Sequence, residues 1–341
     1  MDASLAGSGL TMAAGLAVGL SFVPLKCMTR YRFEHWSSLS AVVSLIVFPW
    51  TLAVALCPDL VGALAQVSFA NYLKANVCSL AWGVANVLCG LCLVRIGVSL
   101  TMGILTGIGL PIGILLPMVL KGSGSFAAAP ALVSRTGAVL AGLTAVLIYS
   151  VVLMAAAGSE REKALCGKPS DFAAFKSGLL MAIAAGFLQT GLSFAFVYSQ
   201  GPLMDALRTR GASGAGAIAA VWAASLLGGA LVNIAFPLSL AIKRGTLRDF
   251  LSPGDCARTI LMATLFVTCL LCMGNGMRLL GALGASLGFG LYQSLQTLSS
   301  QAVGVFSGEW RGTGRRARRR MAAAVLLMLS AVIAMAFLKS R

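Results

Sequence analysis

Long runs of apolar residues, separated by short polar connections, follow one another along the whole chain of 341 residues. A transmembrane helix needs about 20 mostly apolar residues, because the hydrocarbon core of a bilayer is about 30 Å thick. Ten runs fit this requirement. They cover residues 4–25, 37–57, 74–94, 97–120, 132–157, 173–199, 214–242, 257–274, 279–307 and 321–338. The pattern predicts an all-α polytopic membrane protein with ten transmembrane helices.

The composition supports a membrane protein over a soluble one. Hydrophobic residues make up 58% of the chain and charged residues 11%, whereas a soluble domain carries about 25% charged residues. The mean hydropathy is +0.91. The 39 glycines also fit, because small residues allow helices in a membrane to approach each other closely.

The net charge of +16 raises the alternative of a nucleic-acid-binding protein, but the basic residues are placed against it. They fall in the short connections between apolar runs, and six arginines between 311 and 320 directly precede the last run. Such a cluster is typical of a loop that faces membrane lipid headgroups. We therefore expect membrane lipid as a partner and no nucleic acid.

The distribution of basic residues also predicts the orientation. When each one is assigned to its nearest connection, the odd-numbered connections hold 18 of the 26 and the even-numbered ones with the C-terminal tail hold 8. Basic loops stay in the cytoplasm. We expect a multi-pass protein of the cell membrane (inner or plasma membrane), with both termini on the non-cytoplasmic side.

The two halves of the chain resemble each other. Gly-Leu-Ser-Phe occurs at residues 19–22 in the first run and again at residues 191–194 in the sixth. Because each half contains five runs, an odd number, the second half must enter the membrane from the opposite side. The sequence thus predicts two inverted five-helix repeats, residues 1–157 and 173–341, joined by a connecting loop at 158–172. This architecture is common in secondary transporters.

The residue types needed for catalysis or metal binding are scarce inside the apolar runs. All ten acidic residues lie in connections or at the ends of runs, and the only histidine is His35. Cys89 and Cys92, and likewise Cys269 and Cys272, have the spacing of zinc ligands, but without a nearby histidine they are better explained as small apolar residues in helices. We expect no enzymatic activity, no metal and no cofactor.

Uncharged polar and aromatic residues inside the runs are the candidate binding groups. They are Ser21, Trp82, Asn86, Gln189, Ser193, Tyr292, Gln293 and Gln296. Hydroxyls, amides and aromatic rings suit a neutral, polyhydroxylated solute. The alternative is that they form hydrogen bonds between helices.

Prolines and tryptophans predict two local features. Pro111 and Pro117 predict a kinked or broken helix in the fourth run. Trp36, Trp50 and Trp310 lie at the ends of runs and are typical of anchors at the membrane interface.

Several short motifs, in order along the chain, resemble the L-rhamnose–proton symporter family of the drug/metabolite transporter superfamily. They are Pro24-x-Lys26 with Tyr31-Arg32-Phe33-Glu34, Pro49-Trp50 with Pro58, Trp82-Gly83-x-x-Asn86-x-x-x-Gly90-Leu91 with Gly97-x-Ser99, Gly191-x-Ser193-Phe194-Ala195, Gly228-Gly229-Ala230-x-x-Asn233-x-x-Phe236 and Gly308-Glu309-Trp310. The resemblance implies ten helices, an inverted repeat and uptake of a deoxyhexose together with protons.

The resulting hypothesis is a secondary transporter or facilitator that moves a sugar, L-rhamnose or a related neutral polyol, by alternating access. Two alternatives stay open: an exporter of another small polar metabolite, and a membrane scaffold or receptor without transport. The resemblance implies protons as the coupling ion. Because no run has a carboxylate at its centre, the residues themselves predict weak coupling or none.

Overall fold

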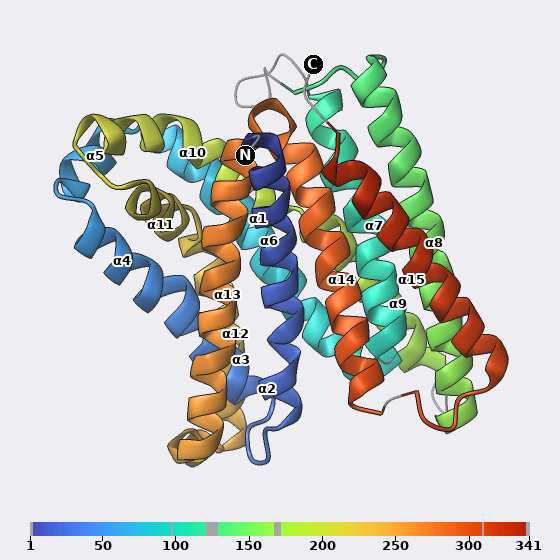
Figure 1. Cartoon of the computed structure of the whole chain (residues 1–341). Coiled ribbons are helices and arrows are strands. Elements are labelled where there is room, and N and C mark those ends of the chain that lie inside the picture. Colours follow the sequence, from blue (N-terminus) through green and yellow to red (C-terminus); the bar gives the residue numbers. More distant parts are fainter. Residues whose placement is uncertain (1–2, 97, 121–128, 167–171, 309, 339–341) are drawn as a thin grey trace.

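The computed structural model describes residues 3–96, 98–120, 129–166, 172–308 and 310–338, and excludes the side chains of 93–94, 98–100, 162–166 and 172–175. Within these residues every regular element is a helix and no β-strand occurs. Figure 1 shows the helices gathered into one bundle, with the start of α1 and the end of α15 at the same face. The predicted all-α class is confirmed.

The helices follow the predicted runs, with several interruptions. The α-helices are α1 (Ala3–Leu20), α2 (Phe22–Lys26), α3 (Phe33–Ala41), α4 (Phe48–Leu56), α5 (Leu60–Gln66), α6 (Phe69–Ile96), α7 (Val98–Val119), α8 (Arg135–Cys166), α9 (Phe172–Leu188), α10 (Gly191–Thr209), α11 (Gly214–Ser225), α12 (Leu227–Arg244), α13 (Pro253–Leu279), α14 (Phe289–Phe306) and α15 (Arg315–Ala336). The π-helical segments are η1 (Val42–Val47) and η5 (Gly284–Gly288), and the 3₁₀ segments are η3 (Leu247–Leu251) and η4 (Gly281–Leu283).

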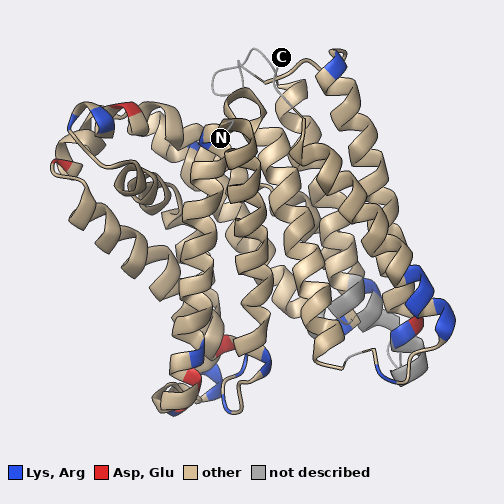
Figure 2. Ribbon diagram, in the orientation of Figure 1, with Lys and Arg blue, Asp and Glu red and all other residues tan. Residues whose placement is uncertain are grey.

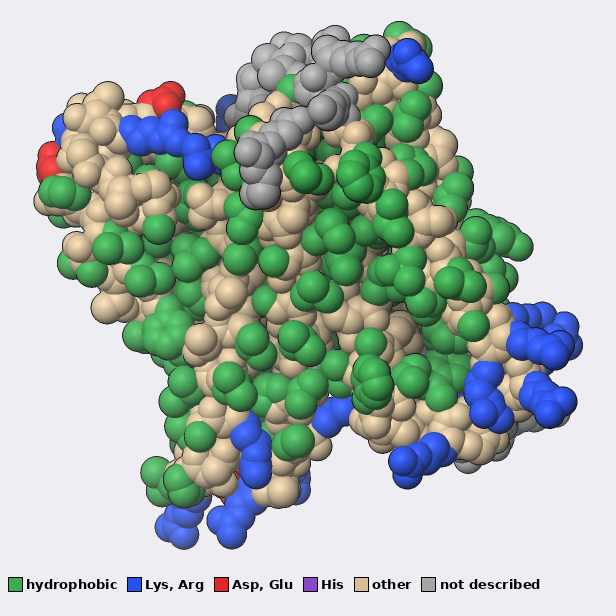
Figure 3. Space-filling model, in the orientation of Figure 1, with side chains coloured by type: hydrophobic (Ala, Val, Ile, Leu, Met, Phe, Trp, Pro, Cys, Tyr) green, Lys and Arg blue, Asp and Glu red, His purple; other side chains and the backbone are tan. Residues whose placement is uncertain are grey.

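The exterior is that of a membrane protein. Eight helical segments among the described residues are long and apolar enough to cross a bilayer, and α11 with α12, bent by 56°, makes up to nine. Figure 3 shows hydrophobic side chains over the middle of the visible face and charged ones near its two ends. Figure 2 places most of the basic residues at the face opposite the chain termini, here called the basic face. A tenth crossing, through η5 and α14, stays a prediction, because α14, which contains three glutamines, is not among the segments apolar enough to be counted.

Breaks in the helices occur at places other than those predicted. α7 is a single helix through Pro111 and Pro117, so the helix is not broken at these prolines, and the predicted kink stays a prediction. The interruptions lie instead at Ser21, between α1 and α2, at Gln189 and Thr190, between α9 and α10, and at Leu226, between α11 and α12. The second run contains the π-helical turn η1. Irregular backbone at membrane depth is tolerated where protein or a water-filled cavity surrounds it.

Glycines bring helices from the two halves of the chain into close contact. A Cβ atom added at Gly15 of α1 would lie 2.7 Å from Leu295 Cβ and 2.8 Å from the Gln296 nitrogen of α14. The Ser299 hydroxyl donates to the Gly15 carbonyl oxygen at 3.2 Å. A Cβ atom at Gly229 of α12 would lie 2.8 Å from the backbone of α6. Only glycine permits these approaches, which fix the helices around the interior.

The helices form two groups of three and two flanking pairs. α1 packs against α13 and α14, while the α9–α10 segment packs against α6 and α7. The segment from α3 to α4 contacts α11 and α12, and α8 packs along α15. The space between the two groups of three contains the site described next.

Candidate functional site

A cavity of about 250 Å³ lies between the two groups of helices. This is close to the lower end of the roughly 300–1,000 Å³ of ligand pockets. The lining residues come from the segments 18–25, 33–45, 82–90 and 102–106 in the first half, and from 189–192, 233, 262–266 and 289–300 in the second. No side chain that the structure describes in α8 or α15 contributes to it. The cavity therefore draws on both halves of the chain and suits a small solute.

Among the described residues, no charged side chain lines the cavity. Every residue that the structure assigns to the wall is apolar, aromatic, a hydroxyl residue, an amide, glycine or cysteine. Fixing a charged solute in such a wall would leave the charge without a partner, which is costly away from water. The wall consequently favours a neutral ligand.

The cavity lies in the half of the bundle nearest the basic face. Leu25 and Phe33 line it beside the connection between α2 and α3, and Met102 lines it near the start of α7. On the other side, α10 and α11 are tightly packed: the rings of Phe196 and Trp222 stack at 4.6 Å, and both side chains are fully buried. This packed core adjoins the cavity through Leu192, Phe289 and Tyr292, which belong to the same cluster and line the cavity.

Seven of the eight predicted binding residues line this one cavity. They are Ser21, Trp82, Asn86, Gln189, Tyr292, Gln293 and Gln296. Ser193 is not among the lining residues; it is fully buried, and its hydroxyl has no partner among the described residues. Ser21 and Ser193 hold equivalent places in the sequence repeat, yet the structure brings only Ser21 to the cavity.

The predicted residues differ in whether their polar groups are free. The Gln189 amide donates to the Leu105 carbonyl oxygen, the Ser21 hydroxyl donates to the Val18 carbonyl oxygen at 2.6 Å, and the Tyr292 side chain is hydrogen-bonded to Cys269. These three residues thus serve the protein's own packing.

Asn86, Gln293 and Gln296 have no side-chain hydrogen bond with a described residue. Asn86 is the most accessible of the three, since its side chain is exposed inside the cavity. An amide offers two donors and an acceptor. These three amides are the groups most available to a ligand.

Aromatic rings form another part of the wall. Trp82 and Phe266 stack at 6.0 Å with an interplanar angle of 12°, and Phe33 and Trp36 meet edge to face at 5.5 Å. All four line the cavity. The prediction that Trp36 is only an interfacial anchor is therefore wrong, because the backbone turns its ring inward. Trp310, also predicted as an anchor, is buried at 7% exposure.

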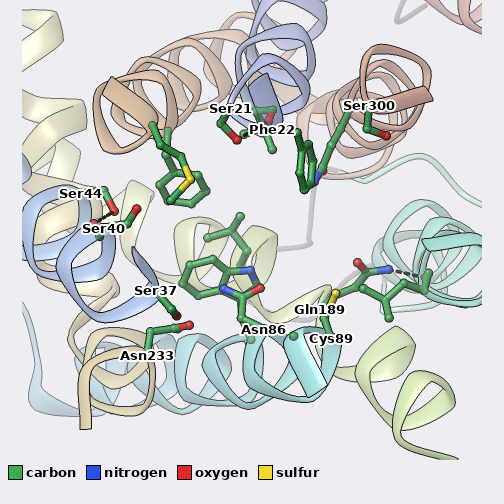
Figure 4. A pocket seen from close by; sticks show the side chains of 18 of the residues that line it. Ser21, Phe22, Ser37, Ser40, Ser44, Asn86, Cys89, Gln189, Asn233 and Ser300 are labelled. Atoms are coloured by element: carbon green, nitrogen blue, oxygen red, sulfur yellow. Dashed lines mark hydrogen bonds between the residues drawn. The ribbon is translucent and has the colours of Figure 1, made fainter. Parts of the chain in front are cut away.

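Several polar lining residues were not predicted. Ser37 and Ser40 of α3 and Ser44 of η1 lie on one face of this continuous helical segment. They line the cavity together with Asn233 of α12. In Figure 4, Ser37, Asn86 and Asn233 enter the cavity from three different elements. The Asn233 amide donates to the Gly229 carbonyl oxygen at 2.9 Å, so its own oxygen is left for a ligand. The spacing of three and four residues between the serines was a helical signal available in the sequence.

The buried acidic residues near the basic face have partners in the protein. Glu34 is fully buried and pairs with Arg244 at 3.0 Å. The Asp255 carboxylate is fully buried too; it accepts backbone N–H bonds from Thr29, Arg30 and Tyr31 and pairs with Arg258 at 2.7 Å.

His35, the histidine of the chain, also makes hydrogen bonds within the protein. His35 Nδ1 accepts the Arg32 N–H, so its Nε2 carries the proton toward the Thr246 carbonyl oxygen at 2.9 Å. Burial also raises the pKa of Tyr31, in the adjoining loop, to about 12. These groups join the loop after α2 and the start of α3 to the end of α12, to η3 and to the start of α13. They do not line the cavity.

The fold and the cavity together define a multi-span helical membrane protein with an internal site for a small neutral molecule. Comparison with known proteins gives the family: the model of the L-rhamnose-proton symport protein (RhaT) matches residues 8–338. The chain belongs to this family.

Individual relatives are more distant. The chain is 26% identical over 309 residues to the L-rhamnose-proton symporter of Salmonella typhimurium strain LT2, covering 86% of each chain. It is 25% identical over 308 residues to the L-rhamnose-proton symporter of Shigella sonnei strain Ss046, with the same coverage. The family resemblance inferred from the motifs is confirmed, and with it a multi-pass membrane transporter.

Proposed function

We propose that this protein carries L-rhamnose or a closely related neutral sugar across the cell membrane by alternating access. One observation carries the proposal: an uncharged cavity, with free amides and aromatic rings, lies between two groups of helices that come from both halves of the chain. Aromatic rings offer an apolar surface to the C–H face of a sugar, and the amides fix its hydroxyls. The name of the family supports the same substrate class.

The packing of the helices supports the inverted repeat on which alternating access would depend. Exchanging the first five predicted spans for the last five turns the contacts of α1 with α13 and α14 into those of the α9–α10 segment with α6 and α7. It also turns the contact of α12 with α6 into that of α3 with α13, and the pair α8–α15 into itself. Such correspondence is expected for repeats 1–157 and 173–341 joined by 158–172. Two equivalent groups of helices could then rock about a shared site.

The charge distribution indicates which side of the membrane the cavity lies nearer. Basic loops remain cytoplasmic, and the cavity lies in the half next to the basic face. In this proposal the structure corresponds to the inward-facing state, with both termini on the outer side. The core around Phe196 and Trp222 forms the closed outer barrier.

Counterflow in liposomes tests the proposal. Purified protein is reconstituted into vesicles loaded with unlabelled L-rhamnose, and entry of labelled L-rhamnose from outside is followed against L-fucose and D-glucose as competitors. A carrier exchanges one molecule for another without any ion gradient, so labelled sugar should accumulate transiently, and L-rhamnose should compete best. A scaffold or receptor gives no counterflow, and an exporter of another metabolite gives it with that metabolite but not with L-rhamnose. Either result would refute the proposal.

A further inference from the structure

The arginines at the start of α15 fall into two groups, one that faces α8 and one that is exposed. Arg320 and Arg316 approach Glu160 of α8, Arg316 at 3.8 Å. Arg315, Arg318 and Arg319 are exposed and form no ion pair with any residue that the structure describes. Figure 2 shows this cluster at the lower end of α15, on the outside of the bundle. Three guanidinium groups are therefore available to an external anion.

The same exposed side of α15 continues as an apolar stripe. Steps of three or four residues keep side chains on one face of a helix, and such steps connect Arg315, Arg319, Ala322, Leu326, Leu329, Ile333 and Phe337. The exposed fractions are 67% for Leu326, 39% for Leu329 and 55% for Ile333. The opposite face, with Ala317, Met321, Ala324 and Met328, is buried in the bundle. The free face thus combines a cationic end with an apolar length.

The dimensions of this stripe match one bilayer. At 1.5 Å per residue, the distance along the helix from Arg319 to Phe337 is about 27 Å, close to the roughly 30 Å of the hydrocarbon core. When Leu326 and Ile333 lie among acyl chains, Arg315 and Arg319 reach the level of the lipid phosphates. Guanidinium groups bind phosphate through two parallel hydrogen bonds.

We propose that the exposed face of α15 is a binding site for an anionic phospholipid of the leaflet on the basic face. Arg315, Arg318 and Arg319 hold its phosphate, and an acyl chain lies along Leu326 and Ile333. A second copy of this chain on the same face would bring like charges together at the paired helix ends, which opposes that alternative. Glu160 weakens the positive field of the site, because its one carboxylate pairs with Arg316 and Arg320 on the side toward α8.

Native mass spectrometry of the delipidated full-length protein tests this site, with phosphatidylglycerol and phosphatidylcholine of identical acyl chains as probes. The variant R315Q/R318Q/R319Q should retain phosphatidylglycerol on the order of 100-fold more weakly than the unaltered protein, with phosphatidylcholine unaffected. The matched control R30Q/K243Q/R248Q removes three exposed basic residues elsewhere and should retain both lipids normally. An equal loss in both variants, or no loss in the first, would overturn the proposal. So would a dimer that excludes lipid.

A second variant tests the same site with an increase in binding. Glu160→Gln leaves Arg316 and Arg320 without their carboxylate. It removes a negative charge from the basic face, so it preserves the charge bias that orients the protein. Retention of phosphatidylglycerol should rise several-fold over the unaltered protein. Unchanged or weaker retention would contradict the proposed role of the cluster even where the triple glutamine variant cannot be purified.

Discussion

Replacement of Asn86 by leucine tests the binding cavity most directly. Asn86 lines the cavity, its side chain is exposed within it, and its amide has no hydrogen bond with a described residue. Leucine has a similar size but can neither donate nor accept a hydrogen bond. Loss of one hydrogen bond to a neutral partner costs about 0.5–1.5 kcal/mol, which corresponds to a roughly 2–13-fold rise in KM. Because no bond within the protein is lost, abundance and thermal stability should stay close to those of the unaltered protein.

The assay is L-rhamnose counterflow in liposomes, normalised to the amount of reconstituted protein. Asn275→Leu is the matched control: the Asn275 amide donates to the Leu271 carbonyl oxygen at 2.9 Å in α13, and Asn275 is not among the cavity residues. It should leave KM unchanged. Asn86→Gln keeps an amide in the cavity and should restore part of the affinity. A normal KM in Asn86→Leu, or the same rise in Asn275→Leu, would refute the assignment of Asn86 to the binding site.

Four further outcomes follow from the structure. A reporter fused after residue 341 should be active only outside the cytoplasm, because basic loops remain inside; cytoplasmic activity would reverse the orientation. A pH gradient of one unit, alone, should not accumulate L-rhamnose in liposomes, because no carboxylate or histidine lines the described cavity wall. Accumulation near the tenfold limit of one-to-one coupling would contradict this. Gly15→Ala should lower thermal stability by about 1–3 kcal/mol through overpacking against α14. Gly9→Ala should not, because there is open space around the added methyl group. Equal melting temperatures for the two variants would argue against the close packing of α1 on α14. Arg210 pairs with Asp59 at 2.6 Å and lowers the pKa of that carboxyl, so the stabilisation from this pair is present above the ordinary carboxyl pKa and lost as the pH falls through the lowered pKa. Asp59→Asn should therefore flatten the acid limb of a stability profile, and an unchanged limb would show that the pair contributes nothing.

Local periodicity and residue type allowed much of the fold to be predicted. Each predicted run contains helix in the structure, since a bilayer demands apolar stretches of a fixed length and backbone hydrogen bonds satisfied within each stretch. Polar residues within such stretches are costly unless they serve a purpose. This is why Asn86, Gln293 and Gln296 could be identified from the sequence as candidate ligand-binding residues.

The tertiary structure decided which polar groups are actually free. Gln189 and Tyr292 were predicted on the same grounds, but their polar groups bind Leu105 and Cys269 on neighbouring helices. Ser193 has the same local sequence as Ser21 and yet faces a packed core.

The reason is that the rotation of each helix about its axis depends on contacts between residues far apart in the chain, such as Ser299 with Gly15, 284 residues away. Helical periodicity states which residues share a face of a helix. Only the close approaches permitted by glycines on partner helices determine whether that face meets the cavity, another helix or the lipid.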